Sequence, residues 1–477
     1  MEAKKQRPEQ EYLELKKAYE KNRIMMGEDH PDTHASLDRL AEYYDRIGDY
    51  DEAIELEEEL LSKRNALYGQ DSEVSGDTYL RLASFYAHRR EYPMAVRLGK
   101  HALTQRIEML GDSNPKTLKA AGRLANLYAS AGMTEEAIKL GDAVLRKRER
   151  TLGEKHHSSI VSRDNLGSYY ADAGDYTKAI QYGKEALRRF HEIQDEPEAI
   201  LKCANRLAGY YNALKQYDDA IAVEREVLSQ MRELQGENHP DTITVLNNLA
   251  LFYGRAHDAN RAVMYGVEAF EKCRNYYGDD HTETWKTRRN LSQYYAKAGK
   301  YALAAKLDQQ NYEFAAKNYG ELAPETIAAE LDLANDLAGN GELKNAIRVG
   351  ESAVTHLRES VGFTDPSTLK AVTALAGFYM EDGNTEEAVS LYRYVYEKRC
   401  EAGQALEKET LRVACELTEL YVRTGKIEEA LDLGNRILDP VRLAYGKVNP
   451  MTTNLVNNLK DALREYDRTE KEKKSNG

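Results

Sequence analysis

Two pairs of cationic residues lie four positions apart in the first half of the sequence. The pairs are Lys119 with Arg123 and Lys202 with Arg206, and Asn165 falls between them. On a helix, residues at this spacing project from one face, where two like charges weaken the helix by about 0.2–0.5 kcal/mol. Two such pairs therefore favour a role in holding an anion through charge-assisted hydrogen bonds.

No pattern typical of an enzyme accompanies these cations. The pair Gly183-Lys184 lacks the following Ser or Thr and the upstream Gly of a phosphate-binding loop. His156-His157 is the only adjacent histidine pair, and it stands where similar stretches of the chain have His-Pro or Asn-Pro. Helix capping is therefore favoured over metal binding for this pair. We expect no catalytic residue, no cofactor and no metal.

The cationic pairs belong to a repeated unit, which residues 236–277 illustrate. A polar residue, Pro240 and an acidic residue open a first helix, as is typical of a helix start. Apolar residues then follow at helical spacing, a polar break occurs at His257-Asp258, and a second apolar series completes a helical hairpin. The small residue of the second helix recurs at eight intervals of 42 and one of 41, as Ala53, Ala95, Ala137, Ala179, Ala220, Ala262, Ala304, Ala346, Ala388 and Ala430.

A fixed period of this length predicts an α-solenoid, because one hairpin cannot bury its apolar stripe alone and stacks on its neighbours. The fold class expected is all-α: a right-handed α-solenoid, or superhelix, of about ten helix-turn-helix repeats with helical caps. Glycine occurs four residues after the repeated Ala in six second helices, where it costs about 1 kcal/mol relative to Ala. We interpret this as close helix–helix approach at Gly99, Gly141, Gly183, Gly266, Gly350 and Gly434.

The repeat resembles the tetratricopeptide repeat. Leu124-Ala125, Tyr128, Gly132 and Ala137 match its signature. The 42-residue period and the Gly-x-x-His-Pro-x-Thr opening are similar to the repeats of kinesin light chain and its relatives. The resemblance covers nearly the entire chain and implies a scaffold that is reused for many partners.

The pattern divides the chain into one solenoid with two ends. The expected order is a flexible N-terminus, an N-terminal capping helix, ten repeats in a single solenoid, a C-terminal capping helix and a disordered tail. The corresponding residues are 1–8, 9–26, 27–445, 446–467 and 468–477.

The resemblance also implies which residues face the concave groove. In tetratricopeptide repeats these include the residue before the Leu-Ala pair and the residue one turn earlier. The candidate peptide-binding residues are accordingly Arg39, Arg81, Lys119, Arg123, Asn165, Lys202, Arg206, Asn248 and Asn290. Such a groove is cationic over the first repeats and carries amides further on.

Two readings of these cations remain open. They resemble the two-carboxylate clamp of some tetratricopeptide domains, although Arg123 stands where that clamp has Asn. Relatives of kinesin light chain similarly bind short acidic peptides that contain an aromatic residue. Alternatively, the arginines pair internally with carboxylates of the same face, such as Asp38, Glu42, Asp77 and Asp164.

The sequence therefore favours a non-catalytic scaffold or adaptor whose concave groove binds an extended, partly acidic peptide or protein segment. The alternative is a regulatory or assembly subunit whose ends or convex face contact a separate effector, such as a protease, a nucleotide-binding switch or a motor. The net charge of −13 argues against nucleic acid as a partner. No apolar run approaches membrane-spanning length. Four cysteines without paired spacing favour a reducing, cytoplasmic location.

Overall fold

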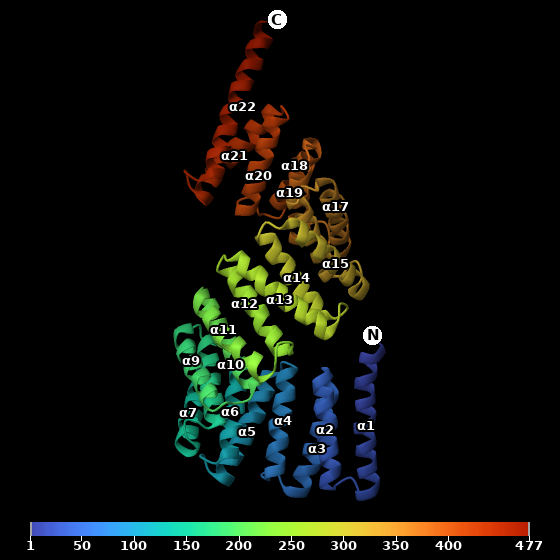
Figure 1. Cartoon of the computed structure of the whole chain (residues 1–477), viewed down its shortest axis with the longest axis vertical. Coiled ribbons are helices and arrows are strands. Elements are labelled where there is room, and N and C mark those ends of the chain that lie inside the picture. Colours follow the sequence, from blue (N-terminus) through green and yellow to red (C-terminus); the bar gives the residue numbers. More distant parts are fainter. Residues whose placement is uncertain (1, 476–477) are drawn as a thin grey trace. The chain divides into compact units, whose positions relative to one another are not determined.

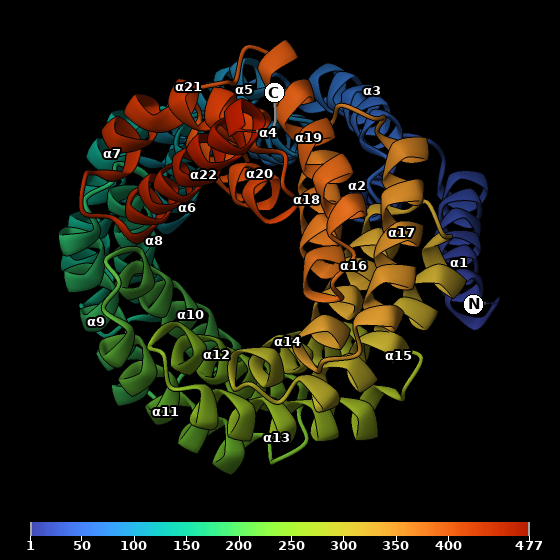
Figure 2. The same cartoon turned by 90° about the horizontal axis from the view of Figure 1, so that it is seen from above.

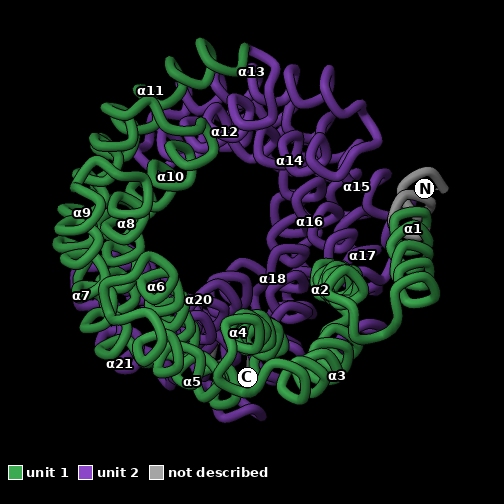
Figure 3. The backbone as a smooth tube through the Cα atoms, turned by 90° about the horizontal axis from the view of Figure 1, so that it is seen from below, with its two compact units in different colours: residues 1–236 green, residues 237–477 purple. Residues whose placement is uncertain are grey.

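The computed structural model describes residues 2–475 of the chain, and the side chains of residues 10–471. These residues form helices joined by short loops, with no strand among them (Figure 1). They divide into two compact units, residues 1–236 and 237–477 (Figure 3). The boundary lies at Gly236, in the loop that opens the sixth hairpin.

Unit 1 begins with one helix, α1 (Glu2–Met26), and continues with five helical hairpins. The first helices of these hairpins are α2 (Pro31–Ile47), α4 (Glu73–His88), α6 (Pro115–Ser130), α8 (His157–Asp172) and α10 (Pro197–Ala213). The second helices are α3 (Tyr50–Tyr68), α5 (Tyr92–Leu110), α7 (Thr134–Leu152), α9 (Tyr176–Glu192) and α11 (Tyr217–Leu234). Within this unit the first helices line the inner side of the curve and the second helices its outer side (Figures 2 and 3).

Unit 2 has the same plan, with five described hairpins followed by one helix, α22 (Pro450–Ser475). Its first helices are α12 (Pro240–Arg255), α14 (Thr282–Lys297), α16 (Pro324–Gly339), α18 (Pro366–Glu381) and α20 (Lys408–Arg423). Its second helices are α13 (Ala259–Tyr277), α15 (Tyr301–Tyr319), α17 (Leu343–Ser360), α19 (Thr385–Glu401) and α21 (Ile427–Tyr445). The all-α solenoid of helical hairpins predicted from the sequence is confirmed.

The two ends of the described chain differ from the expected bounds. Helix α1 begins at Glu2 rather than at residue 9, and α22 continues to Ser475 instead of ending near residue 467. Arg468 lies 3.6 Å from Glu465, three residues earlier, and such pairs stabilise a helix beyond its packed part. The expected disorder of residues 468–477 stays a prediction. The mobility of residues 1–8 and the continuity of residues 27–445 as one solenoid stay predictions.

One loop shows how the repeated motif starts a first helix. Gly362 has φ of 97°, a backbone conformation that L side chains rarely adopt. Asp365 accepts a hydrogen bond from the Ser367 N–H at 2.8 Å, which caps α18. The Thr368 hydroxyl donates to the Gly362 carbonyl at 2.8 Å and closes the loop. The spacing of Gly, cap and Thr in the sequence therefore encodes one loop geometry.

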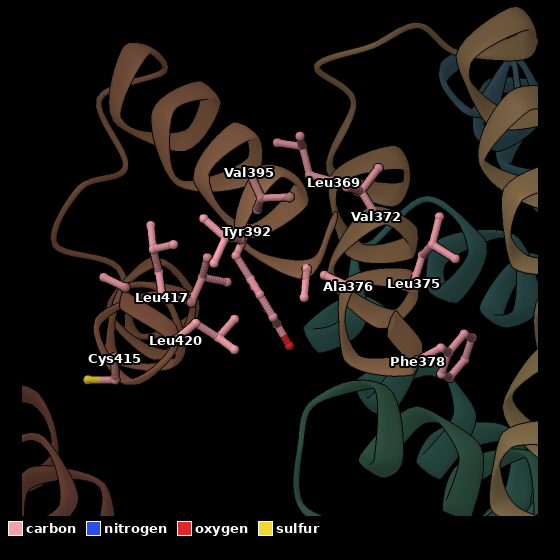
Figure 4. Close-up of a cluster of buried hydrophobic side chains, with 14 of the residues drawn as sticks. Leu369, Val372, Leu375, Ala376, Phe378, Tyr392, Val395, Cys415, Leu417 and Leu420 are labelled. Atoms are coloured by element: carbon pink, nitrogen blue, oxygen red, sulfur yellow. The ribbon is translucent and has the colours of Figure 1, made fainter. Parts of the chain in front are cut away.

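Apolar side chains of neighbouring hairpins form buried clusters that join successive hairpins in each unit. In unit 2, Tyr392 and Val395 of α19 lie between apolar side chains of α18 and α20 (Figure 4). Val372 of α18 and Leu420 of α20 are fully buried there. Each hairpin thus buries its stripe against the next, as a solenoid requires.

The glycines of the second helices lie against the first helix of the next hairpin. A Cβ atom on Gly266 would stand 2.9 Å from Cδ2 of Tyr294, and one on Gly434 would stand 2.5 Å from Cδ2 of Leu459. Both distances are shorter than an ordinary carbon–carbon contact. The close approach predicted from the six glycines is confirmed.

Candidate functional site

The candidate site in unit 1 centres on α6. Asn114 caps this helix by accepting from the Lys116 N–H at 2.9 Å, and Pro115 follows as its first residue. Leu118 and Leu124 are buried between helices. Packing of these two leucines fixes the rotation of α6 about its axis and therefore decides which side chains face solvent.

Lys119 and Arg123 occupy the exposed face of α6. Neither side chain forms an ion pair or a side-chain hydrogen bond with any residue that the structure describes. Residues four apart on a helix place their Cβ atoms about 5–6 Å apart, so the two cations share one patch. This is the arrangement that the sequence indicated for an anion.

A third cation lies beneath this patch. Arg148 of α7 reaches toward α6, where a Cβ atom on Gly122 would be 3.6 Å from one of its guanidinium nitrogens. Its guanidinium donates to the Leu118 carbonyl at 3.1 Å and to the Ser162 hydroxyl at 2.7 Å. These acceptors are neutral, and burial lowers the pKa of Arg148. The positive charge of Arg148 is thus not compensated by a hydrogen-bonded carboxylate.

The preceding two hairpins bind the equivalent arginine differently. Arg64 donates to both oxygens of Asp38, at 3.0 and 2.8 Å, and Arg106 pairs with Asp77. Two repeat periods after Asp38 the chain has Gly122, and one repeat period after Asp77 it has Lys119. Each of the two preceding hairpins has one of these carboxylates, whereas the third hairpin has neither and carries a lysine at one of the two positions, so α6 carries a local excess of positive charge.

Two predicted arginines are instead neutralised within the solenoid. Arg81 of α4 pairs with Asp38 at 2.5 Å and with the buried Glu57 at 2.8 Å. Arg206 of α10 pairs with Asp164 of α8, whose side chain is only 3% exposed. For these two residues the internal-pairing reading applies.

The remaining candidates of unit 1 are distributed over three helices. Arg39 of α2 is exposed, with no ion pair to another described residue. Lys202 of α10 pairs with Glu198 at 2.6 Å, but both side chains are about 70% exposed, so solvent screens this pair. Asn165 of α8 is half-buried. That these side chains line one inner surface together with Lys119 and Arg123 stays a prediction.

The two amides predicted further along the chain belong to unit 2. Asn248 is half-buried on α12, and Asn290 is exposed on α14. Their position relative to the cations of unit 1 stays a prediction.

The histidine pair that could have suggested a metal site has two separate roles. His156 accepts from the Ser158 N–H at 3.1 Å and caps α8, as predicted. His157 lies 2.5 Å from Asp195, the residue that replaces the loop glycine of other repeats. Neither histidine needs a metal to explain its position.

Sequence reasoning missed two arginines that do not point freely into solvent, the half-buried Arg148 and the buried Arg288. Both stand at positions of the repeat that hold apolar side chains in other hairpins, for example Met231 for Arg148 and Leu246 for Arg288. Comparing charge at equivalent core positions would have identified them.

Comparison with known sequences and folds is consistent with this architecture. A tetratricopeptide repeat model matches residues 75–146, 120–191, 200–271 and 244–317, and a second one matches residues 33–73. Together these matches cover more than half of the chain. The chain belongs to the tetratricopeptide repeat family. A comparison with curated protein sequences gives no match.

Solved tetratricopeptide-type structures are similar at low identity. BtubC (BKLC) from P. vanneervenii is 19% identical, with 48% of this chain and 92% of that chain covered and a TM-score of 0.41. The apo form of the quorum sensor NprR from B. thuringiensis is 15% identical, with 76% and 98% covered and a TM-score of 0.44. The STAND protein PH0952 from Pyrococcus horikoshii, which has a tetratricopeptide repeat sensor, is 14% identical, with 78% and 54% covered and a TM-score of 0.49. These similarities concern the fold alone.

A tetratricopeptide repeat solenoid is a protein-interaction scaffold, and this role applies to the chain. Among the described helices, none combines the length and the apolar character needed to cross a membrane.

Proposed function

We propose that this tetratricopeptide repeat protein is a non-catalytic adaptor whose inner surface in unit 1 binds an extended, partly acidic peptide or protein segment. The observation that carries the proposal is the uncompensated positive charge of α6. Lys119 and Arg123 are exposed with no acidic partner among the described residues, while Arg81 of α4 and Arg206 of α10 are paired.

The chemistry of this patch favours a carboxylate ligand. A guanidinium can form two parallel hydrogen bonds with a carboxylate, and such charge-assisted bonds are about twice as strong as neutral ones. Arg39 of α2 and Asn165 of α8 offer further donors to an extended peptide. The net charge of −13 for the whole chain makes a polyanion such as nucleic acid a poor partner, so short acidic segments are preferred.

The test is a binding titration with a fluorescein-labelled peptide rich in Glu and Asp with a single Trp. Lys119→Glu combined with Arg123→Glu should weaken binding by about tenfold or more, which corresponds to at least 1.4 kcal/mol. The matched control is Lys139→Glu with Arg146→Glu on α7, since both side chains are more than 75% exposed on an outer helix. Equal loss of binding in both variants, or no loss in the α6 variant, would contradict the proposal.

A second candidate function, assembly with a separate effector, is favoured by one edge of unit 2. Four consecutive loops between hairpins each expose an apolar side chain at 45–94%: Leu322, Phe363, Leu406 and Val448. The corresponding loops of unit 1 carry charged residues such as Asp112 and Glu154. Exposed apolar side chains that recur along one edge are typical of a protein-contact surface.

A further inference from the structure

A cavity of about 670 Å³ lies on the outer side of unit 2. It opens between the second helices α13 and α15, and α14 forms its floor. Figure 2 shows α13 and α15 on the outer layer and α14 on the inner layer. This volume falls within the usual range for small-molecule sites, about 300–1,000 Å³.

The floor of the cavity is apolar. Phe270 of α13, Leu291 of α14 and Phe314 of α15 line it and are at least 91% buried. Leu303 lines the mouth and is 47% exposed. A ligand with an apolar body would remove this surface from water, at about 25 cal/mol per Å².

One charged side chain at the base of the cavity is almost completely buried. Arg288 of α14 is 6% exposed, and it lines the cavity. Its Nε donates to the amide oxygen of Asn311 at 2.9 Å, and no ion pair joins its guanidinium to a described residue. A buried guanidinium without a carboxylate carries a desolvation cost, which an anion entering the cavity would offset.

Charged residues are rare at the position of the repeat that Arg288 occupies. The equivalent position of seven other described hairpins is apolar and mostly buried: Leu37, Tyr79, Ala121, Ala204, Leu246, Val372 and Ala414. The other two charged occupants, Arg163 and Glu330, each have an ionisable partner on a second helix. Arg163 pairs with Glu149, and Glu330 lies 2.9 Å from His356. Packing alone therefore does not require a charge here, and Arg288 differs from both in having no such partner.

The surroundings fix the orientation of Arg288. Asn311 is fully buried, and its amide nitrogen donates to Asp308 at 3.0 Å, so its oxygen is turned toward Arg288. Trp285 donates to the Asn311 backbone carbonyl at 3.2 Å and stacks on Phe314. This arrangement holds α14 and α15 together around the guanidinium. Asn311 is a positioning residue in this arrangement.

The rim limits the charge of the ligand. Arg274, Lys306 and Lys317 line the cavity, and so do four carboxylates: Glu271, Asp279, Asp280 and Glu313. Together with Arg288 these charges cancel, so the cavity offers no excess positive charge to a ligand with several negative charges, such as a nucleotide or a phosphate ester. A ligand with one anionic group next to Arg288 and an uncharged apolar body therefore matches both the apolar floor and the charges of the rim.

We propose that this cavity binds a small amphipathic monocarboxylate, with its carboxylate on Arg288 and its apolar body on Phe270, Leu291 and Phe314. Two sources share this chemistry: a free aliphatic acid, and the apolar C-terminal residue of a peptide. The site is independent of the acidic-peptide surface of unit 1.

Isothermal titration calorimetry on the full chain tests the site with octanoate and with N-acetylphenylalanine. The matched probes octanamide and N-acetylphenylalaninamide lack the carboxylate, and inorganic phosphate tests for a general anion site. We expect saturable binding of at least one carboxylate, about tenfold tighter than its amide. Preference for octanoate identifies a free acid as the ligand source, whereas preference for N-acetylphenylalanine identifies a peptide C-terminus. Absence of binding by both acids, or equal binding of phosphate, overturns the proposal.

Arg288→Leu removes the charge while keeping a residue that the fold accepts, because Leu37 and Leu246 are buried at the same position. We expect carboxylate binding to fall about tenfold or more with an unchanged or higher melting temperature. Arg163→Leu is the matched control at the equivalent position of another hairpin, and it should leave binding unchanged. If Arg288→Leu fails to fold, Leu303→Glu at the mouth provides the second variant, and it should weaken octanoate binding by charge repulsion. Retained affinity in either folded variant overturns the assignment.

Discussion

Gly141 of α7 lies so close to Tyr169 of α8 that a Cβ atom on Gly141 would stand 2.7 Å from Cε2 of the tyrosine ring. The ring is itself buried and cannot move into solvent without exposing the core between the third and fourth hairpins. The short distance between the third and fourth hairpins therefore requires that residue 141 has no side chain.

Gly141→Ala should accordingly destabilise unit 1. Overpacking costs about 1–3 kcal/mol, while replacing a mid-helix glycine returns about 1 kcal/mol, so we expect a net loss of up to about 2 kcal/mol. Urea unfolding followed by circular dichroism measures the change, and hydrogen exchange locates it in α7 and α8.

Gly209→Ala is the control for this substitution. Gly209 is an exposed residue of α10, and a Cβ atom there would meet no atom within 4 Å. This variant should be more stable than the parent by about 0.5–1 kcal/mol. A stabilising Gly141→Ala would show that α7 and α8 are further apart than described.

The glycine positions show how much of the fold follows from the sequence. The six glycines occupy the same position of the repeat, four residues after the repeated Ala. Because glycine destabilises a helix, its recurrence at one position of the repeat indicates a close contact that recurs in each of these hairpins. The partner was not predictable in the same way, because Gly141 meets Tyr169 and Gly350 meets Leu375 at 3.2 Å. The periodicity thus predicts that a close contact exists, whereas the residue that the glycine contacts depends on the side chains of each hairpin.

Asp164→Asn should strengthen the binding of acidic peptides. The buried carboxylate of Asp164 pairs with Arg206 of α10, and an amide at this place carries no negative charge. The freed guanidinium would join Lys119 and Arg123 as an uncompensated cation. We expect affinity for the labelled acidic peptide to rise about three- to tenfold, or roughly 0.7–1.4 kcal/mol, in an anisotropy titration.

Two further variants make this prediction specific. Arg206→Gln in the Asp164→Asn background should return the affinity to that of the parent chain. Asp112→Asn removes an exposed loop carboxylate, paired with Lys147 at 2.6 Å, and should leave the affinity unchanged. A general rise in both aspartate variants would indicate a nonspecific charge effect rather than release of Arg206.

The candidate site was less predictable than the fold. Exposure of Lys119 and Arg123 follows from the helix phase, since buried leucines occupy the opposite face. Pairing of Arg81 and Arg206 depends on carboxylates 42 or 43 residues earlier, in the neighbouring hairpin. The rotamer of a long side chain decides whether it contacts such a carboxylate or extends into solvent, and the sequence pattern does not determine this rotamer.

Glu57 should make the stability of unit 1 dependent on pH. Burial raises the pKa of this carboxyl from its ordinary value of 4.5 to about 7, despite the nearby Arg81. Oε1 accepts from Arg81, whereas Oε2 is buried without a hydrogen-bond partner among the described residues. The ionised form is thus the costly one in the folded chain.

The raised pKa fixes the direction of the pH effect. Between pH 4.5 and about 7 the folded chain keeps the Glu57 proton, while the unfolded chain loses it. The stabilising contribution is therefore complete below pH 4.5 and is lost as the pH rises through about 7. At pH 8 the loss should amount to roughly 2–3 kcal/mol.

Urea unfolding of the parent chain and of Glu57→Gln at pH 5 and pH 8 measures this contribution. The Gln variant should lose less stability between the two pH values than the parent, because its amide does not titrate. Glu55→Gln, at an exposed position of the same helix, should behave like the parent. An identical pH dependence in the parent and in Glu57→Gln would contradict the raised pKa.

The exposed loops of unit 2 provide the last prediction, which concerns assembly with an effector. Leu406 and Val448 are 72% and 94% exposed, so replacing each with Asp removes apolar surface without creating a cavity. Surface substitutions of this kind change folding stability by less than about 0.5 kcal/mol. If this edge contacts a partner, Leu406→Asp with Val448→Asp should abolish co-purification of a stoichiometric protein while leaving acidic-peptide binding intact.

The control variant changes charged residues in loops of unit 1. Asp112→Asn with Glu154→Gln should leave co-purification of the partner protein unchanged. Loss of peptide binding in the Leu406 and Val448 variant would instead show that the edge supports the fold, because no effector contact could explain it.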